Sequence, residues 1–339
     1  MQLNPLALSL GDPAGVGPEL IVQAWQQRAA EQLPPFLVAG GQGVLADAAR
    51  AQGAGVAIVP IDEPGDALGV FAEGIPVLGA AGTGWRPGVP DSDGAWLAWE
   101  SLKWATALAR DGKACAIVTA PVSKAALTAV GFSFPGQTEF LAHACGIPES
   151  QAVMMLAGPN LRTVPLTIHC ALADVPRLLS EDLIVSRGRA VAAALTRDFG
   201  IAHPRIAVTG LNPHAGEGGV FGREEIDLIA PAIARLRSEG IDASGPHPAD
   251  ALFAPHKRNS FDVALCMYHD QALIPVKALD FDSGVNVTLG LPIIRTSPDH
   301  GTAFDIAGKG LAHPGALIAA IRMAGEMATR RADTRTVDA

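Results

Sequence analysis

Short apolar segments alternate with longer amphipathic stretches along almost the whole chain. This pattern predicts an α/β protein with a mostly parallel sheet and flanking helices, because a strand–helix alternation is typical of that class. The strands are expected at Leu6–Leu10, Phe36–Ala39, Ala114–Thr119, Thr163–Ile168, Arg205–Thr209 and Phe261–Met267. The helices are expected at Pro18–Arg28, Ala95–Arg110, Ser123–Ala129, Asp174–Leu179, Asp182–Phe199, Arg223–Glu239 and His313–Ala328.

Two segments depart from this alternation. Residues 60–94 are rich in Gly, Pro and Asp, which predicts irregular surface structure or a link between two lobes. The last ten residues, Arg330–Ala339, are polar and are expected to fray. The length of 339 residues favours two domains over one.

The composition excludes several classes of protein. Apolar residues make up 49% of the chain and charged residues 17%, which suits a large core and argues against disorder. No apolar run reaches the roughly 18 residues of a membrane span, and the N-terminus lacks the features of an export signal, so a cytoplasmic protein is expected. The net charge is −9 and the basic residues are scattered, which argues against a nucleic-acid partner.

Three histidines stand at or just past the ends of apolar runs. They are His169, His214 and His269. Ligands collect beyond the carboxyl ends of the strands in an open parallel sheet, so three imidazoles there could converge on a metal ion. Each of them could equally be an ordinary loop histidine. Position alone leaves both interpretations open.

Two loops that follow strands have the same ambiguity. Gly11–Glu19 is neither a dinucleotide-binding GxGxxG nor a Walker A motif, so it is either a tight structural turn or a loop that faces substrate. Thr119–Lys124 could hold an anion at a helix N-terminus. It could equally cap the helix through Ser123 and leave Lys124 on the surface.

Polar residues are dense between Tyr268 and Gly310. Lys277, Asn286 and Arg295 recur at intervals of nine residues, and a guanidinium with an amine and an amide is suited to a phosphate or carboxylate. Solvated surface cations are the alternative. The glycine-containing run from Pro298 to Gly310 predicts a loop built for close backbone approach.

Six motifs together resemble one known family. GDPAGVGPE, TAPVSK, FPGQTEFLA, LNPHAGEGG, YHDQALIPVK and SPDHGTAFDIAGKG occur in this order between Leu8 and about Gly310. They resemble the 4-hydroxythreonine-4-phosphate dehydrogenase (PdxA) family of pyridoxal-phosphate biosynthesis. The last motif also resembles the cofactor loop of isocitrate and isopropylmalate dehydrogenases, whose two-lobed fold this family shares.

The resemblance implies an architecture with the active site in the cleft between two lobes. The nucleotide-side lobe would be discontinuous, comprising residues 1–128 plus 290–339. Residues 129–289 would form the lobe for metal, substrate and dimerisation. The site would lie at a homodimer interface, with ligands from both subunits.

The resemblance also implies roles for particular residues. The metal ligands would be His169, His214 and His269, around zinc, magnesium, cobalt or manganese. The substrate contacts would come from Gln137, Thr138, Lys277, Asn286 and Arg295. The contacts to NAD or NADP would come from His300, Gly301, Thr302, Asp305 and Lys309. Asp250 and Asp270 are candidates for orienting a ligand or accepting a proton, or are structural.

The reaction implied by the resemblance is the oxidation of a small phosphorylated hydroxy acid, 4-phosphooxy-L-threonine. Its product, 2-amino-3-oxo-4-phosphooxybutanoate, decarboxylates to 3-amino-2-oxopropyl phosphate. Gln137 stands where the family pattern has histidine, which leaves open a sister dehydrogenase for threonate 4-phosphate, erythronate 4-phosphate or a cis-diol. A metallohydrolase and a non-catalytic metabolite-binding protein are further alternatives. The loop from His300 to Lys309 argues against a hydrolase, which has no use for a nucleotide cofactor.

Overall fold

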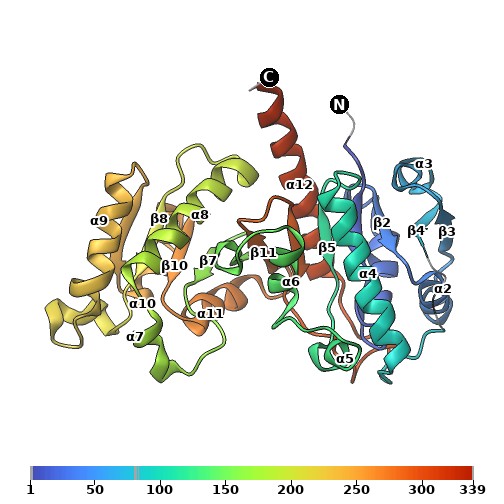
Figure 1. The fold of residues 1–339 in the computed structure, drawn as a ribbon, viewed down its shortest axis with the longest axis horizontal. Helices are drawn as coiled ribbons and strands as arrows, with labels where there is room; N and C mark the ends of the chain where they lie inside the picture. The colour runs from blue at the N-terminus through green and yellow to red at the C-terminus, as the bar shows by residue number, and fades with distance from the viewer. Residues whose placement is uncertain (1–2, 80–81, 83, 338–339) are drawn as a thin grey trace. The chain divides into compact units, whose positions relative to one another are not determined.

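The computed structural model describes residues 3–79, 82 and 84–337, with the side chains of 334–337 left out. Contacts between Cα atoms divide the chain into two compact units (Figure 1). The first comprises Met1–Glu149 and Leu291–Ala332, and the second consists mainly of Ser150–Gly290. The prediction from sequence placed the corresponding breaks after residues 128 and 289. The first unit is therefore assembled from two separate pieces of the chain.

The sheet of the first unit is parallel. Its strands follow the order β3-β4-β2-β1-β5-β12. Strands β1 and β2 are buried along their whole length, as expected of parallel strands with both faces covered. The bounds are β1 (Leu6–Ser9), β2 (Phe36–Ala39), β3 (Ala57–Ile61), β4 (Gly74–Leu78), β5 (Ile117–Thr119) and β12 (Arg295–Pro298).

Helix α4 (Ser92–Arg110) packs against β1, β2 and β5 (Figure 1). It begins where Asp91 Oδ1 accepts a hydrogen bond of 2.7 Å from Gly94 N, a typical N-cap. Ala95, Ala98, Leu102 and Ala105 recur at helical spacing and are buried. The other helices of this unit are α1 (Gly17–Gln26), α2 (Gln42–Ala51), η1 (Pro64–Asp66), α3 (Ala67–Val70), α5 (Lys124–Ala129), α6 (Gln137–Ala144) and α12 (Gly315–Val337).

The sheet of the second unit is mixed, with strand order β11-β6-β7-β10-β8-β9. Strand β6 is antiparallel to both β11 and β7, whereas β7, β10, β8 and β9 are parallel. Helix α11 (His269–Asp280) packs against β7, β10 and β6, where Leu273 and Val276 join Phe261 in the core. The bounds are β6 (Val153–Ala157), β7 (Arg162–Pro165), β8 (Ile206–Thr209), β9 (Ala243–His247), β10 (Val263–Cys266) and β11 (Val285–Leu289).

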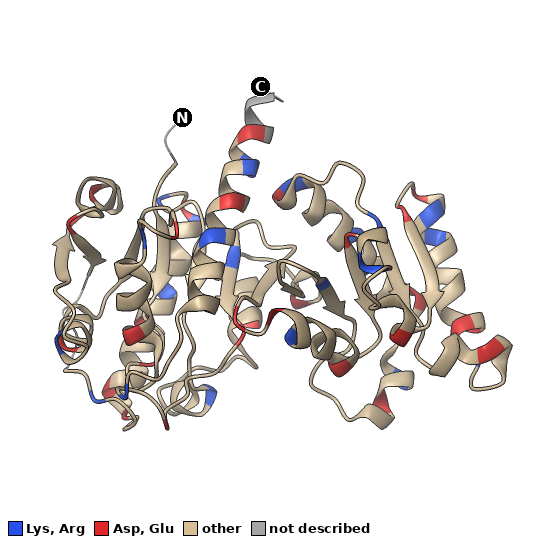
Figure 2. Ribbon diagram, turned by 180° about the vertical axis from the view of Figure 1, so that it is seen from behind, with Lys and Arg blue, Asp and Glu red and all other residues tan. Residues whose placement is uncertain are grey.

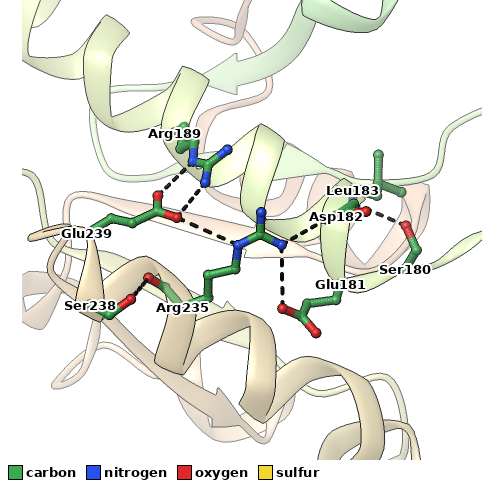
Figure 3. Close-up of polar contacts among 8 residues, drawn as sticks. All are labelled: Ser180, Glu181, Asp182, Leu183, Arg189, Arg235, Ser238 and Glu239. Carbon is green, nitrogen blue, oxygen red and sulfur yellow. Dashed lines mark hydrogen bonds and ion pairs between the residues drawn. The ribbon is translucent and has the colours of Figure 1, made fainter.

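Helices α8 and α9 of the second unit pack on each other, and an arginine–carboxylate network joins them (Figure 3). Arg189 of α8 pairs with Glu239, and Arg235 of α9 donates to Asp182 at 2.8 Å. The helices of this unit and of the connection to it are η2 (Glu149–Gln151), η3 (Leu172–Asp174), α7 (Val175–Leu178), α8 (Glu181–Phe199), η4 (Pro213–Gly219), η5 (Glu225–Ile229), α9 (Ala230–Ser238), α10 (Ala249–Leu252), η6 (Arg258–Ser260) and α11 (His269–Asp280).

Every strand and helix predicted from the sequence has a counterpart in the structure; Phe36–Ala39 has the predicted bounds, and the others have shifted ends. The prediction for residues 60–94 was wrong in part: the end of β3, η1, α3, β4 and the start of α4 fall there, whereas residues 84–91 belong to no helix or strand. Residues 80, 81 and 83 lie outside the described part. Strand β3 was missed because it is an edge strand with little burial. The prediction of fraying after residue 329 was also wrong as far as residue 337, because α12 continues to Val337. Residues 338–339 lie outside the described part.

Charged residues are interspersed along the described parts of both units (Figure 2). No described helix combines the length and the apolar character that a membrane crossing requires.

Candidate functional site

Three neighbouring strands of the second unit lead into the three histidines. His169 lies shortly after β7, His214 lies in η4 after β8, and His269 is the first residue of α11 after β10. Strand β10 pairs in parallel with both β7 and β8. The carboxyl ends of the three strands therefore lie at one edge of the sheet, so the histidines all follow the same edge.

Two of the three histidine rings lie close together. The ring centroids of His169 and His269 are 6.1 Å apart. Two imidazoles on one ion have centroids roughly 5 to 6 Å apart, given metal–nitrogen bonds of about 2.0–2.1 Å. The ring of His214 instead has Phe221 as a neighbour, at 6.4 Å. Among the described residues, no three His, Cys, Asp or Glu side chains form a group that could hold a metal ion.

The carboxylate that follows His269 in the chain contacts its ring. Asp270 Oδ1 lies 2.7 Å from His269 Nδ1. This contact leaves Nε2 as the nitrogen available to a metal. Asp250, the other candidate carboxylate, is exposed on α10, and α10 packs against the η4 segment that contains His214.

The sequence did not reveal the role of Gln271, whose hydrogen bonds link the end of β8 to the end of β10. Its Oε1 accepts hydrogen bonds from Thr209 Oγ1 and Met267 N, both of 2.7 Å, and its Nε2 donates to Gly210 O at 2.8 Å. The position of Gln271, directly after His269 and Asp270, was the available signal.

Arg295 is a buried cation of the first unit. It begins β12, is only 5% exposed, and donates from Nε and Nη2 to Thr119 Oγ1 at 3.1 and 2.8 Å. Burial lowers the pKa of its guanidinium to about 10, against the opposing influence of Glu139. A cation buried at this cost is stabilised by an anion that binds beside it.

Two predicted substrate residues present buried oxygens that lack a hydrogen-bond partner within the described structure. They are Gln137 Oε1, at the start of α6 in the first unit, and Asn286 Oδ1, on β11 in the second. Buried polar atoms in native proteins are rarely left in this state, so both atoms are suited to a ligand that donates. Thr138 beside Gln137 is half-buried, and Lys277 on α11 is exposed.

Three loops of the first unit meet beyond β1, β5 and β12. Asp12 N donates to Pro121 O, and Val16 N donates to Thr302 O, both at 2.9 Å. Gly15 is required there, because a Cβ would lie 2.7 Å from Thr302 O. Ser123 accepts from Ala126 N at 3.3 Å, so this serine caps α5.

A buried carboxylate connects α1 to the glycine-rich run after β12. Glu19 is fully buried, and its Oε2 accepts from Gly308 N at 3.1 Å. Its Oε1 has no hydrogen-bond partner in the described structure, and burial raises the pKa of this carboxyl. Of the predicted nucleotide contacts, Thr302 is half-buried, and the others are exposed: His300, Gly301, Asp305 and Lys309.

Comparison with known proteins gives a consistent set of relatives. The family model described as pyridoxal phosphate biosynthetic protein PdxA matches residues 31–324. The chain is 65% identical to 4-hydroxythreonine-4-phosphate dehydrogenase of Erythrobacter litoralis, over 97% of this chain and 98% of the relative. It is 52% identical to the enzyme of the same name from Zymomonas mobilis, over 97% of each chain.

Two solved structures extend the comparison. The 4-hydroxythreonine-4-phosphate dehydrogenase of Klebsiella pneumoniae matches with a TM-score of 0.85 at 37% identity, over 96% of this chain and 99% of that one. A terephthalate 1,2-cis-dihydrodiol dehydrogenase from Burkholderia xenovorans matches with a TM-score of 0.65 at 33% identity, over 96% and 98%. The family model matches most of the chain, and the identities extend along nearly its whole length. The chain therefore belongs to the PdxA family of pyridoxal phosphate biosynthetic proteins.

Proposed function

We propose that this chain is a metal-dependent, NAD(P)-linked dehydrogenase that oxidises 4-phosphooxy-L-threonine to 2-amino-3-oxo-4-phosphooxybutanoate in the cytoplasm. That product decarboxylates to 3-amino-2-oxopropyl phosphate. The observation that carries the proposal is the 65% identity, over 97% of the chain, to a protein named 4-hydroxythreonine-4-phosphate dehydrogenase.

The second unit would supply the metal ligands His169, His214 and His269. The proximity of two of these rings and the origin of all three from neighbouring parallel strands support this assignment. Imidazole ligands suit zinc, and cobalt, manganese and magnesium are further candidates. A bound divalent ion would lower the pKa of the substrate hydroxyl, and NAD(P)+ would accept the hydride. Asp270 orients the ring of His269 so that Nε2 remains available.

The first unit would bind the anionic part of the substrate through Arg295. This guanidinium is buried and hydrogen-bonded to Thr119, so a phosphate or carboxylate beside it would offset the cost of desolvation. Gln137 and Thr138 would bind polar groups of the substrate from α6. In the second unit, Asn286 and Lys277 would do the same.

The loop from His300 to Lys309 would bind the nucleotide. Its backbone is held by Val16 and Glu19, while His300, Asp305 and Lys309 remain exposed. An anchored backbone with exposed polar side chains is suited to a ligand that contacts the loop from outside.

The working form would be a homodimer with shared active sites. Val220, Phe221 and Ile226 of the second unit are 73%, 52% and 43% exposed, and the ring of Phe221 neighbours His214. Exposed apolar side chains grouped in this way are typical of an interface. A second copy that covered them would lie beside His214, which supports a metal site completed by ligands from both subunits.

A sister activity is the main alternative within the same class of enzyme. The chain is 33% identical to a protein named terephthalate 1,2-cis-dihydrodiol dehydrogenase. Gln137 is an uncharged amide at a predicted substrate position, which is compatible with other substrates such as threonate or erythronate 4-phosphate. The buried cation Arg295 favours an anionic group in the substrate.

A substrate panel tests the proposal. The purified protein is incubated with 4-phosphooxy-L-threonine, with the 4-phosphates of threonate and erythronate, and with a cis-diol, each with NAD+ or NADP+ and each metal. Formation of reduced nicotinamide with the phosphorylated threonine, at the highest kcat/KM of the panel, is the expected result. Absence of reduction with every substrate, no thermal shift with either nucleotide, and hydrolysis of a phosphate ester would favour a metallohydrolase.

A further inference from the structure

The loop that carries His214 has an uncommon backbone conformation. Six successive residues, 214–219, have positive φ. Three of them are not glycine: His214, Ala215 and Glu217 have φ of 53°, 52° and 44°. Residues with a Cβ enter this left-handed region at an energetic cost, so such a run persists only where its surroundings hold it.

The carboxylate of Glu225 holds this loop from the start of η5. Glu225 is only 3% exposed. Its Oε1 accepts hydrogen bonds from the backbone N–H groups of Leu211 and Asn212, both at 2.8 Å, and its Oε2 accepts from Asn212 Nδ2 at 3.0 Å. The residues that lead into His214 are therefore held by this buried side chain, and Asn212 Nδ2 also donates to Glu224 Oε2 at 2.7 Å.

The residues that follow His214 in the chain also lie close to this carboxylate. A Cβ on Gly216 would lie 2.6 Å from Glu225 Oε2, so only glycine permits this approach. Glu225 thus contacts the loop both before and after the histidine. Rotation of the loop backbone in either direction would break hydrogen bonds or bring the backbone into the carboxylate.

We infer that Glu225 is a positioning residue that fixes the backbone on either side of His214, so that the imidazole is presented to a divalent metal in one orientation. This role rests on the proposed function, in which His214 is a metal ligand. Glu225 acts through the backbone of Leu211 and Asn212. Supporting groups that orient metal ligands typically change metal affinity by about 10- to 100-fold when they are removed.

The test compares Glu225→Ala and Glu225→Gln with a matched control, Glu239→Ala. Glu239 is also a glutamate of the second unit, but it pairs with Arg189 and Arg235 between α8 and α9 (Figure 3). Co²⁺ alone is titrated into the full-length, metal-free protein by calorimetry. We expect about 10- to 100-fold weaker binding for Glu225→Ala and a change within about twofold for Glu239→Ala.

The Co²⁺ affinity of the conservative variant Glu225→Gln is expected to lie between those of Glu225→Ala and Glu239→Ala. The carbonyl oxygen of the introduced amide can still accept from Leu211 and Asn212, but its NH₂ group would face the donor Asn212 Nδ2, so Co²⁺ binding should weaken severalfold. Hydrogen exchange of the metal-free protein gives a readout independent of metal. The amides of Leu211 and Asn212 should exchange faster in Glu225→Ala than in the wild type.

Three outcomes separate the possibilities. Wild-type affinity for Co²⁺ in Glu225→Ala, or unchanged exchange at Leu211 and Asn212, would overturn the role of Glu225 and leave the proposed function standing. If Glu225→Ala does not fold, wild-type affinity in Glu225→Gln would overturn the role. A wild-type protein that does not bind Co²⁺ would reject the proposed metal site, and the role of Glu225 with it.

Discussion

His269 Nδ1 lies 2.7 Å from the carboxylate oxygen Oδ1 of Asp270, the next residue in the chain. A carboxylate in this position favours the tautomer that carries its proton on Nδ1, and so leaves the lone pair of Nε2 free for a cation. The two residues stand at the start of α11, so the helix backbone fixes both relative to the end of β10. The contact therefore gives His269 a defined orientation before any metal binds.

Asp270→Asn should weaken metal binding by about 10- to 100-fold, because the amide can no longer act as a charged acceptor for the ring. Titration of the metal-free protein with Zn²⁺ or Co²⁺ measures the effect. Asp282→Asn is a suitable control, since Asp282 is an exposed aspartate of the same unit. Equal affinity in Asp270→Asn and the control would show that the contact has no role in metal binding.

His214→Ala should abolish metal-dependent turnover and leave the fold intact, because His214 is exposed and contributes little to the core. Oxidation of 4-phosphooxy-L-threonine, with circular dichroism as a check on folding, measures both parts of the expectation. His203→Ala removes another exposed histidine of the second unit and should retain full activity. Full activity in His214→Ala would remove this residue from the proposed ligand set.

The order of the strands explains how far sequence could predict the candidate site. His169, His214 and His269 could be placed at one edge because each follows an apolar run and parallel strands share the direction of their carboxyl ends. The strands that carry Asn286 and Arg295 were not predicted. Their sequences, VNVTL and RTSP, include polar residues and so lack a clear apolar signal.

The residues that support the loops could not be predicted from the sequence, for a different reason. Glu225 and Gln271 act through hydrogen bonds to backbone groups of other segments, such as Asn212 and Gly210. No local pattern of apolar and polar positions indicates such pairs. The left-handed backbone at His214 is likewise fixed by these long-range contacts, and its glycine neighbours give the only local indication.

Arg295→Ala should raise the KM for a phosphorylated substrate by about 100-fold, the effect of losing roughly 2–3 kcal/mol from a buried charged contact. Steady-state kinetics with 4-phosphooxy-L-threonine measure the change, and kcat should fall less than KM rises. Arg50→Ala, which removes an exposed arginine of the first unit, is the control. An unchanged KM would exclude Arg295 from the substrate pocket.

Phe221→Asp should convert the proposed dimer to a monomer, because a carboxylate would have to be desolvated in an apolar interface. Light scattering after size-exclusion chromatography measures the mass, and activity should be lost together with the dimer. The control is Leu311→Asp, since Leu311 is 68% exposed in the first unit. A dimeric Phe221→Asp variant would place the interface elsewhere, and a monomeric wild type would reject the dimer itself.

Glu19→Gln should stabilise the protein near neutral pH. Burial raises the pKa of Glu19 above its usual 4.5, so the folded protein binds this proton more tightly than the unfolded chain does. The stability that Glu19 contributes is therefore fully present below about pH 4.5 and is lost as the pH rises through the folded-state pKa. Glutamine does not titrate and can still accept from Gly308 N, so the variant avoids this loss.

Thermal unfolding of wild type and Glu19→Gln across this pH range measures the difference. The variant should melt higher near pH 7, by roughly 2–4 °C for each 1 kcal/mol gained, and the two curves should converge toward pH 4. Glu73→Gln, at an exposed glutamate of the first unit, should show no such divergence. If nucleotide affinity is retained in Glu19→Gln, the hydrogen bond to Gly308 suffices to hold the loop, and the charge of Glu19 is a cost to the fold that nucleotide binding does not require.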